Sequence, residues 1–305
     1  MEPAPIGEVL PGRASTAGCG SCGDVRKMQF TAPLEPTAPR QSAALAVGSV
    51  SPDFATGRAA TPTDRVLCNA ASGDRMTQLS YTTALIVGAG EGLSASLARA
   101  LSRNGLRVGL AARNPEKLQA LSAETGAATF VCDAQEQSEV ERMFAAVEAQ
   151  LGMPDVVIYN ASARTRGPLV ALDPEDVRRT LMVTAFGAFL VARSAASRML
   201  PGGHGAILFT GASASVKGYA ESAPFAMGKF ALRGLAQSMA RELSPKGIHV
   251  AHFVIDGAIR RRAQTDERDA TLDPDAIAST YLAVLMQPRS AWTWEVELRP
   301  WVERF

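Results

Sequence analysis

Residues Thr83 to Leu101 read TALIVGAGEGLSASLARAL, and this stretch decides the fold that the sequence predicts. It opens with a short apolar run, Ala84 to Val87, of the kind found in buried strands. A turn containing Gly88, Gly90 and Gly92 follows, and leucines then recur at helical spacing. The order of strand, glycine turn and helix predicts a place where backbone N–H groups and the positive end of a helix hold a dinucleotide pyrophosphate. The alternative is an ordinary strand-to-helix turn that happens to be rich in glycine.

Length and composition set the broad class of the protein. The chain has 305 residues, 47% apolar residues and a formal net charge of +1. This length suffices for one large α/β domain, and the balanced charge gives no reason to propose a nucleic-acid or membrane-surface partner. No apolar run in the sequence is long enough to cross a bilayer. Four cysteines are too few for a disulfide framework, which favours a reducing compartment such as the cytoplasm, and the three histidines suggest no metal site.

Residues 1–75 differ in composition from the rest of the chain. They are rich in Ala, Pro, Gly, Ser and Thr, and they lack sustained apolar periodicity. Such a segment cannot bury enough apolar surface to offset its ordering entropy, so we expect a disordered, low-complexity extension before a single domain at 76–305. Met76 directly precedes the first predicted strand and is a candidate start of the protein. Cys19 and Cys22 have the spacing of a redox or metal pair, although coincidence is the preferred interpretation because no second pair accompanies them.

Strands and helices alternate from Met76 onward. The predicted strands lie at 84–87, 106–111, 127–131, 156–159, 206–209, 248–255 and 294–298. The predicted helices begin after Gly92, near Asn114, at Glu136, at Asp173, at Ala223 and at Asp273, and the fourth runs through to Met199. Strands separated by helices of this length predict an α/β fold with a Rossmann-like, doubly wound parallel sheet.

From about Leu79 onward, the sequence resembles the short-chain dehydrogenase/reductase family. Gly88-x-x-x-Gly92-x-Ser94 is similar to the family's G-x-x-x-G-x-G, with Ser in place of the last Gly. Asp133 stands where the family has an Asp beside the adenine ring, and Asn160-Ala161-Ser162 resembles its N-A-G motif. Phe225-x-x-x-Lys229 occupies the place of its Y-x-x-x-K. The cofactor contacts that the resemblance implies come from Gly88, Gly90, Gly92, Leu93, Arg113, Asp133, Asn160, Ala161, Lys229 and Gly257.

The end of the second predicted strand bears on the choice of nicotinamide cofactor. An acid at this position would hydrogen-bond the adenosine ribose and disfavour a 2′-phosphate, but the chain has Ala112 followed by Arg113. Because a guanidinium grips a phosphate with paired hydrogen bonds, Arg113 favours NADP(H) over NAD(H). Glu91 in the glycine turn would repel that phosphate, and Arg113 has an alternative interpretation as a solvated residue at a helix start.

The resemblance also implies a catalytic Tyr, Ser and Asn beside the Lys, and most of these are replaced. In the family the Tyr transfers the proton that accompanies hydride transfer, whereas Phe225 has no transferable proton. Ala212 stands at the Ser position with Ser213 one residue later, and Thr184 stands at the Asn position. Lys229 is retained. The losses therefore affect proton transfer, and the retained residues serve the cofactor.

Two functions remain open on this basis. One is an NADP(H)-dependent oxidoreductase acting on a small carbonyl, alcohol or activated double bond through an atypical proton path. The other is a catalytically silent nicotinamide-dinucleotide-binding protein, a sensor or scaffold. Tyr219 and Asp256 are alternative proton-transfer groups, and the run Arg260–Arg262 is either a basic lid over an acidic substrate or a solvated loop. The helices from Asp173 and Ala223 pair subunits in the family, so we expect a homodimer or homotetramer.

Overall fold

The structure is a computed structural model that describes residues 79–303. The predicted extension at 1–75, with Cys19 and Cys22, and the candidate start at Met76 lie outside the described residues.

Seven strands form one sheet in the order β3-β2-β1-β4-β5-β6-β7. All six neighbouring pairs are parallel. The strands are β1 (Thr83–Val87), β2 (Arg107–Ala112), β3 (Ala128–Val131), β4 (Val156–Tyr159), β5 (Gly205–Thr210), β6 (Ile248–Ile255) and β7 (Glu295–Leu298). Strand order reverses between β1 and β4, which places a ligand crevice at the carboxyl ends of these two strands. The predicted Rossmann-like, doubly wound α/β sheet is confirmed.

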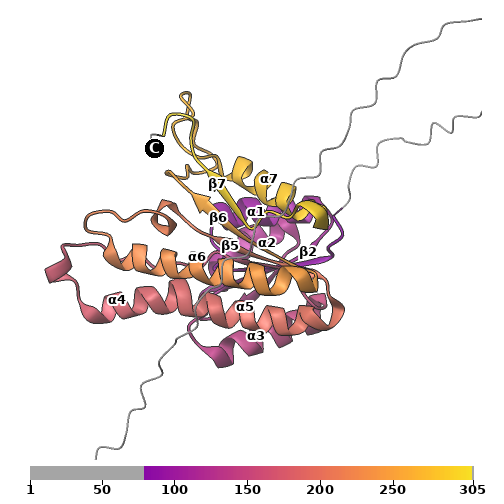
Figure 1. The fold of residues 1–305 in the computed structure, drawn as a ribbon. Coiled ribbons are helices and arrows are strands. Elements are labelled where there is room, and N and C mark those ends of the chain that lie inside the picture. Colours follow the sequence, from indigo (N-terminus) through magenta and orange to yellow (C-terminus); the bar gives the residue numbers. More distant parts are fainter. Residues whose placement is uncertain (1–78, 304–305) are drawn as a thin grey trace, which may run out of the picture. The chain divides into compact units, whose positions relative to one another are not determined.

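Helices cover both faces of this sheet. They are α1 (Leu93–Arg103), α2 (Gln119–Thr125), α3 (Gln137–Leu151), α4 (Pro174–Leu181), α5 (Gly187–Met199), α6 (Ala223–Leu243) and α7 (Pro274–Leu285). Figure 1 shows α1, α2 and α7 on one face and α3, α5 and α6 on the other, with α4 continuing the line of α5. The sheet is therefore the middle of three layers.

The alternation of side chains explains why the central strands β1, β4 and β5 are apolar along most of their length. In β1, Ala84 and Ile86 join the core beneath α1 and α7, whereas Leu85 and Val87 join the core beneath α3, α5 and α6. Successive strand residues point to opposite faces, so a strand covered on both faces must be apolar at every position.

The helix predicted from Asp173 to Met199 contains an interruption. A π-helical turn, Met182–Phe186, separates α4 from α5. The Tyr159 hydroxyl donates a hydrogen bond to the carbonyl of Val183 in this turn. A Cβ on the following residue, Gly187, would come within 2.6 Å of that hydroxyl, so the helix approaches β4 closely here because Gly187 has no side chain. This contact gives a physical reason for the π turn, a feature frequent at functional sites.

Contrary to the prediction that no apolar run is long enough, the helical stretch Pro174–Gly202 is long and apolar enough to cross a membrane by length and composition alone. More than half of its most apolar window is buried inside the protein. The core helix of a soluble protein has the same character, and α5 contributes nine buried residues to the described part of the chain.

Candidate cofactor and active site

The glycine turn between β1 and α1 brings two strands together at the ligand crevice. Gly88 has a φ of +84°, and a Cβ there would overlap the backbone of Ala161, which follows β4. Only glycine meets both conditions. In contrast, a Cβ on Gly90 or Gly92 would meet no atom within 4 Å. The turn therefore has open space above it, next to the N-terminus of α1, where backbone N–H groups can approach a phosphate.

Ser94, which replaces the last glycine of the motif, connects this turn to β4. Its hydroxyl donates to the Gly88 carbonyl at 3.2 Å and accepts from the Asn160 amide at 2.7 Å. The Asn160 backbone N–H also donates to the Val87 carbonyl at 2.8 Å. Because Ser94 and Asn160 hold each other in place, the substitution preserves the shape of the turn.

One cavity of about 590 Å³ lies beside the glycine turn. Its lining includes five residues that the sequence indicated, Gly88, Arg113, Asp133, Asn160 and Ala161. Lys117, which the sequence analysis missed, lines the same cavity four residues after Arg113. Both cations are exposed, and within residues 79–303 neither makes a hydrogen bond or an ion pair. Two cations without an ion-pair partner in this part of the chain thus line the cavity.

Asp133 also lines this cavity and makes hydrogen bonds within the protein. Its carboxylate accepts a hydrogen bond from the Gln135 backbone N–H at 3.1 Å, and its own N–H donates to the Glu139 carboxylate at 2.7 Å. The neighbouring Cys132 is a buried free thiol, and burial raises its pKa to about 12. A thiol with this pKa is an inert packing residue.

A second cavity of about 580 Å³ adjoins the first, because Asn160 lines both. Leu93, Ser213, Phe225 and Gly257 line this second cavity. Phe225 projects from the first turn of α6, and Ser213 begins the short 3-10 turn Ser213–Ser215 after β5. The structure therefore brings most of the predicted site residues to two adjoining cavities. Gly90, Gly92, Thr184 and Lys229 line neither of them.

Lys229 lies one helical turn after Phe225 and is almost fully buried, with 3% of its surface exposed. Its Nζ donates to the Thr210 carbonyl at 2.7 Å and lies 5.8 Å from the centre of the Phe225 ring. Burial lowers the pKa of Lys229 to about 8. An ammonium has three protons, and Thr210 is its one hydrogen-bond acceptor among the described residues, so the group is suited to bind further hydroxyl oxygens.

Thr184 differs from the expectation that it belongs to the reacting group. It is fully buried and lines neither cavity. Its hydroxyl, on the π-helical turn, accepts a hydrogen bond from the Ala163 backbone N–H at 3.2 Å. Thr184 thus holds the segment that follows Asn160 in position through this hydrogen bond.

Asp256 and Tyr219, the alternative proton-transfer groups, both line the second cavity. The Asp256 carboxylate is buried and accepts a hydrogen bond from Lys217 at 3.1 Å, with Arg299 at 3.5 Å. This hydrogen bond raises the pKa of Lys217. Asp256 is therefore engaged as half of an ion pair. Tyr219 is half exposed, and Lys217 lies 5.9 Å from its ring centre.

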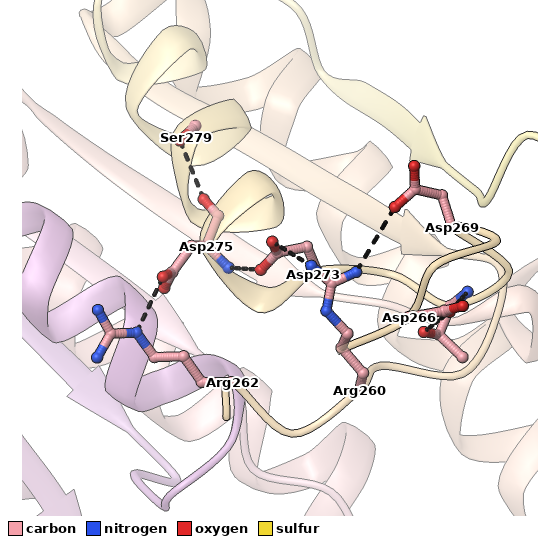
Figure 2. Close-up of polar contacts among 8 residues, drawn as sticks. Arg260, Arg262, Asp266, Asp269, Asp273, Asp275 and Ser279 are labelled. Carbon is pink, nitrogen blue, oxygen red and sulfur yellow. Dashed lines mark hydrogen bonds and ion pairs between the residues drawn. The ribbon is translucent and has the colours of Figure 1, made fainter. Parts of the chain in front are cut away.

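The basic run Arg260–Arg262 is directed toward acidic residues of its own chain. Arg260 pairs with Asp273 at 2.6 Å, and Arg262 pairs with Asp275 at 2.9 Å. Figure 2 shows both arginines pointing toward the start of α7. Neither lines the second cavity, so these two arginines tie the loop to α7 instead of forming a basic lid over the substrate.

A buried chain of hydrogen bonds, which the sequence analysis missed, connects the Ser213–Ser215 turn to β6 and β7. The Ser215 hydroxyl accepts from the Ala212 backbone N–H at 3.1 Å and lies 3.3 Å from His252 Nε2. His252 Nδ1 lies 3.1 Å from Glu295, which also binds Arg233 at 2.6 and 2.7 Å. Burial lowers the pKa of His252 to about 4. Because Ser215 and His252 are fully buried, this chain is a scaffold and is closed to substrate.

Taken together, the fold and the crevice define an α/β protein of the dinucleotide-binding class. The chain belongs to the short chain dehydrogenase family, whose model matches residues 82–270. Members of this family bind nicotinamide dinucleotide cofactors.

Individual relatives agree with this assignment. Gluconate 5-dehydrogenase of Gluconobacter oxydans is 31% identical over 179 residues, which are 56% of this chain and 69% of the relative. The crystal structure of a short-chain dehydrogenase from Rhodopseudomonas palustris is 36% identical and has a TM-score of 0.64, covering 72% of this chain and 99% of that one. A metagenomic short-chain oxidoreductase in complex with NADP is 28% identical with a TM-score of 0.64, covering 73% of this chain and 99% of that one.

Proposed function

We propose that the protein is an NADP(H)-dependent oxidoreductase that acts on a small alcohol, carbonyl or activated double bond, with Phe225 in the place of the family's catalytic Tyr. The observation that carries this proposal is the pair of adjoining cavities that share Asn160. One contains the glycine turn and two cations, and the other contains Ser213 and Phe225. Together they fit the two ends of an extended dinucleotide.

The residues of the chain divide into those that hold the cofactor and those that face the substrate. Backbone N–H groups of the glycine turn and the N-terminus of α1 bind the diphosphate. The unused protons of Lys229 bind the ribose hydroxyls next to the nicotinamide. A bound nicotinamide cofactor accepts a hydride when an alcohol is oxidised, with release of one proton, and it donates a hydride in the reverse reaction.

The preference for NADP(H) rests on Arg113 and Lys117. Both cations line the first cavity and have no ion-pair partner among the described residues, so a 2′-phosphate would supply one. Glu91 is exposed on the glycine turn, does not line that cavity and therefore opposes the phosphate only weakly. The relative crystallised with NADP adds support from sequence similarity.

Calorimetric titration with NADPH and NADH tests this preference. Charge-assisted hydrogen bonds contribute about 1.5–3 kcal/mol each, so the double variant Arg113→Gln with Lys117→Gln, which removes two of them, is expected to weaken NADPH binding by roughly 100-fold or more. NADH binding should stay within about 2-fold, and Arg193→Gln, an exposed arginine on α5, is the matched control. Equal affinity for both cofactors in the wild type would refute the assignment.

The proton path is the atypical part of the site. Phe225 has no proton to transfer, so we propose that Ser213 donates a hydrogen bond to the substrate oxygen. The proton exchanges with water in the cavity and with Lys229. Because the pKa of Lys229 is about 8, this side chain can release and take up a proton near neutral pH. This path is slower than a direct Tyr donor by about two to four orders of magnitude.

A silent nicotinamide-binding protein is the second candidate, and Phe225 is the observation that favours it. Turnover of alcohols and carbonyls with NADP(H) is to be compared between the wild type and Phe225→Tyr. Slow turnover in the wild type that increases in the variant supports the enzyme. Cofactor binding with turnover only in the variant supports the silent binder.

A homodimer or homotetramer and a cytoplasmic location also belong to this proposal. Four large apolar side chains on the π turn, α5 and α6 are exposed, namely Phe186 (42%), Phe189 (43%), Met227 (51%) and Phe230 (45%). Such a surface on neighbouring helices is typical of a subunit interface.

A further inference from the structure

Two arginines that the proposed reaction does not use line the second cavity. Arg164 and Arg166 lie in the extended segment that follows Asn160. The alternate residues of this segment are fixed to the protein. The Ala163 N–H donates to Thr184, Thr165 Oγ1 lies 3.0 Å from Thr180 Oγ1, and the Gly167 N–H donates to the Glu221 carbonyl at 3.0 Å.

Burial alternates along this segment. Ala163, Thr165 and Gly167 are half-buried, and the Thr165 hydroxyl lies against Thr180 inside the protein. Arg164 and Arg166, between them, are exposed and line the cavity. The segment therefore holds two guanidinium groups beside the place where hydride transfer is proposed.

Arg164 also lies against the residue that distinguishes this chain from its family. Its guanidinium carbon lies 4.9 Å from the centre of the Phe225 ring, which is a cation–π arrangement. Stacking on a ring face leaves the N–H groups at the edge of a guanidinium available to a ligand. Within residues 79–303, neither Arg164 nor Arg166 makes a hydrogen bond or an ion pair.

The other charges around the cavity are largely paired. Asp256 binds Lys217 and lies near Arg299. Arg260 binds Asp273, which caps α7, and Arg262 binds Asp275 in its first turn (Figure 2). Glu303 is the one lining carboxylate with no ion-pair partner in the described part of the chain. Two unpaired guanidinium groups thus face one unpaired carboxylate, and the cavity has an excess of positive charge.

We propose that Arg164, with Arg166 beside it, binds a carboxylate of the substrate, so that the substrate class is small oxo acids or hydroxy acids. This inference rests on the proposed oxidoreductase function and deepens it. A planar guanidinium donates two parallel hydrogen bonds to a carboxylate. Phe225 supplies the flat apolar face against which Arg164 is held, and the carboxylate binds at the free edge of the guanidinium. Hydride transfer then takes place at a carbon that this contact fixes in position.

The test measures binding and turnover separately. Oxo acids, their methyl esters and a phosphorylated hydroxyketone are titrated by calorimetry into the protein saturated with NADP⁺, and the same compounds are assayed with NADPH. In the wild type, oxo acids are expected to bind more tightly than their esters. In Arg164→Gln, the affinity for the acids should fall about 10- to 100-fold while that for the esters is unchanged. Arg261→Gln, an exposed arginine that lines neither cavity, should change neither.

The outcomes distinguish this inference from the proposed function. If the wild type does not bind NADP⁺, both are overturned. If it binds NADP⁺ but acids and esters bind equally, or if Arg164→Gln lowers both affinities alike, only the carboxylate inference is overturned. Tighter binding of the phosphorylated ketone than of any oxo acid also overturns it, since the anion would then be a phosphate. Glu303→Gln should tighten binding of the acids, because it removes the unpaired carboxylate of the lining.

Discussion

Replacing Lys229 should stabilise the cofactor-free protein and at the same time weaken cofactor binding. Burial lowers the pKa of Lys229 from 10.5 to about 8, which corresponds to about 3 kcal/mol of unfavourable free energy for the charged form. Lys229→Met removes this term and leaves the Thr210 carbonyl without its donor, at a cost of about 1 kcal/mol. The net gain in the free energy of unfolding at pH 7 is therefore about 2 kcal/mol.

The sign of the pH dependence follows from the same shift. Between pH 8 and 10.5 the unfolded chain binds a proton that the folded chain has released, so the stability of the wild type rises with pH across this range. The difference between Lys229→Met and the wild type should consequently shrink as the pH rises. Lys246→Met, at a half-exposed lysine, is the control that should show neither effect.

Urea unfolding at pH 7 and pH 9.5, combined with calorimetric titration of NADPH, measures both parts of this prediction. The variant should be more stable without cofactor and should bind NADPH at least 10-fold more weakly, because the ammonium's contacts with the ribose are lost. A variant that is less stable than the wild type at both pH values, or one that binds NADPH equally well, would refute the role assigned to Lys229.

Three further predictions follow from the site and its surroundings. Phe225→Tyr should raise kcat by about two orders of magnitude or more at pH 8, and an unchanged kcat in steady-state assays would show that the proton path lies elsewhere. The free energy of unfolding of the wild type should fall by up to about 3 kcal/mol as the pH drops from 6.5 to about 4. In this range His252 is protonated in the unfolded chain but stays neutral in the folded protein, where it is buried. His252→Gln should flatten that slope in urea titrations, and a slope equal to that of the wild type would contradict the assignment. Phe189→Glu should shift the sedimentation coefficient toward that of a monomer, and no shift would remove α5 from the interface.

The fold was largely predictable because its signals are local. Each predicted strand lies within one residue of the observed one. The central strands are covered on both faces, so they form apolar runs that are easy to recognise in a sequence. The π turn at Met182–Phe186 was not predictable, because it depends on the contact between Tyr159 and the helix across a long stretch of sequence. Residues 1–75 remain a prediction.

The site was predictable for residues that directly follow a strand. It was less predictable for loop residues whose partners lie far away in the sequence. The glycine turn and Asn160 both follow strands, and the carboxyl ends of parallel strands meet at one edge. The sequence could not decide whether Arg260–Arg262 forms a basic lid or a solvated loop, because only the structure places Asp273 and Asp275 against Arg260 and Arg262. Arg164 and Arg166 were missed, although the sequence shows two arginines alternating with the small residues Ala163, Thr165 and Gly167 shortly after Asn160.

The central claim is that the crevice at the carboxyl ends of β1 and β4 holds a nicotinamide dinucleotide. The most direct measurement is a crystal structure of the protein grown with NADPH. We expect the diphosphate at the N-terminus of α1, the 2′-phosphate beside Arg113 and the nicotinamide ring in the cavity of Ser213, Phe225 and Gly257. Crystals in which saturating NADPH leaves this crevice without nucleotide density, or binds elsewhere on the surface, would contradict the account.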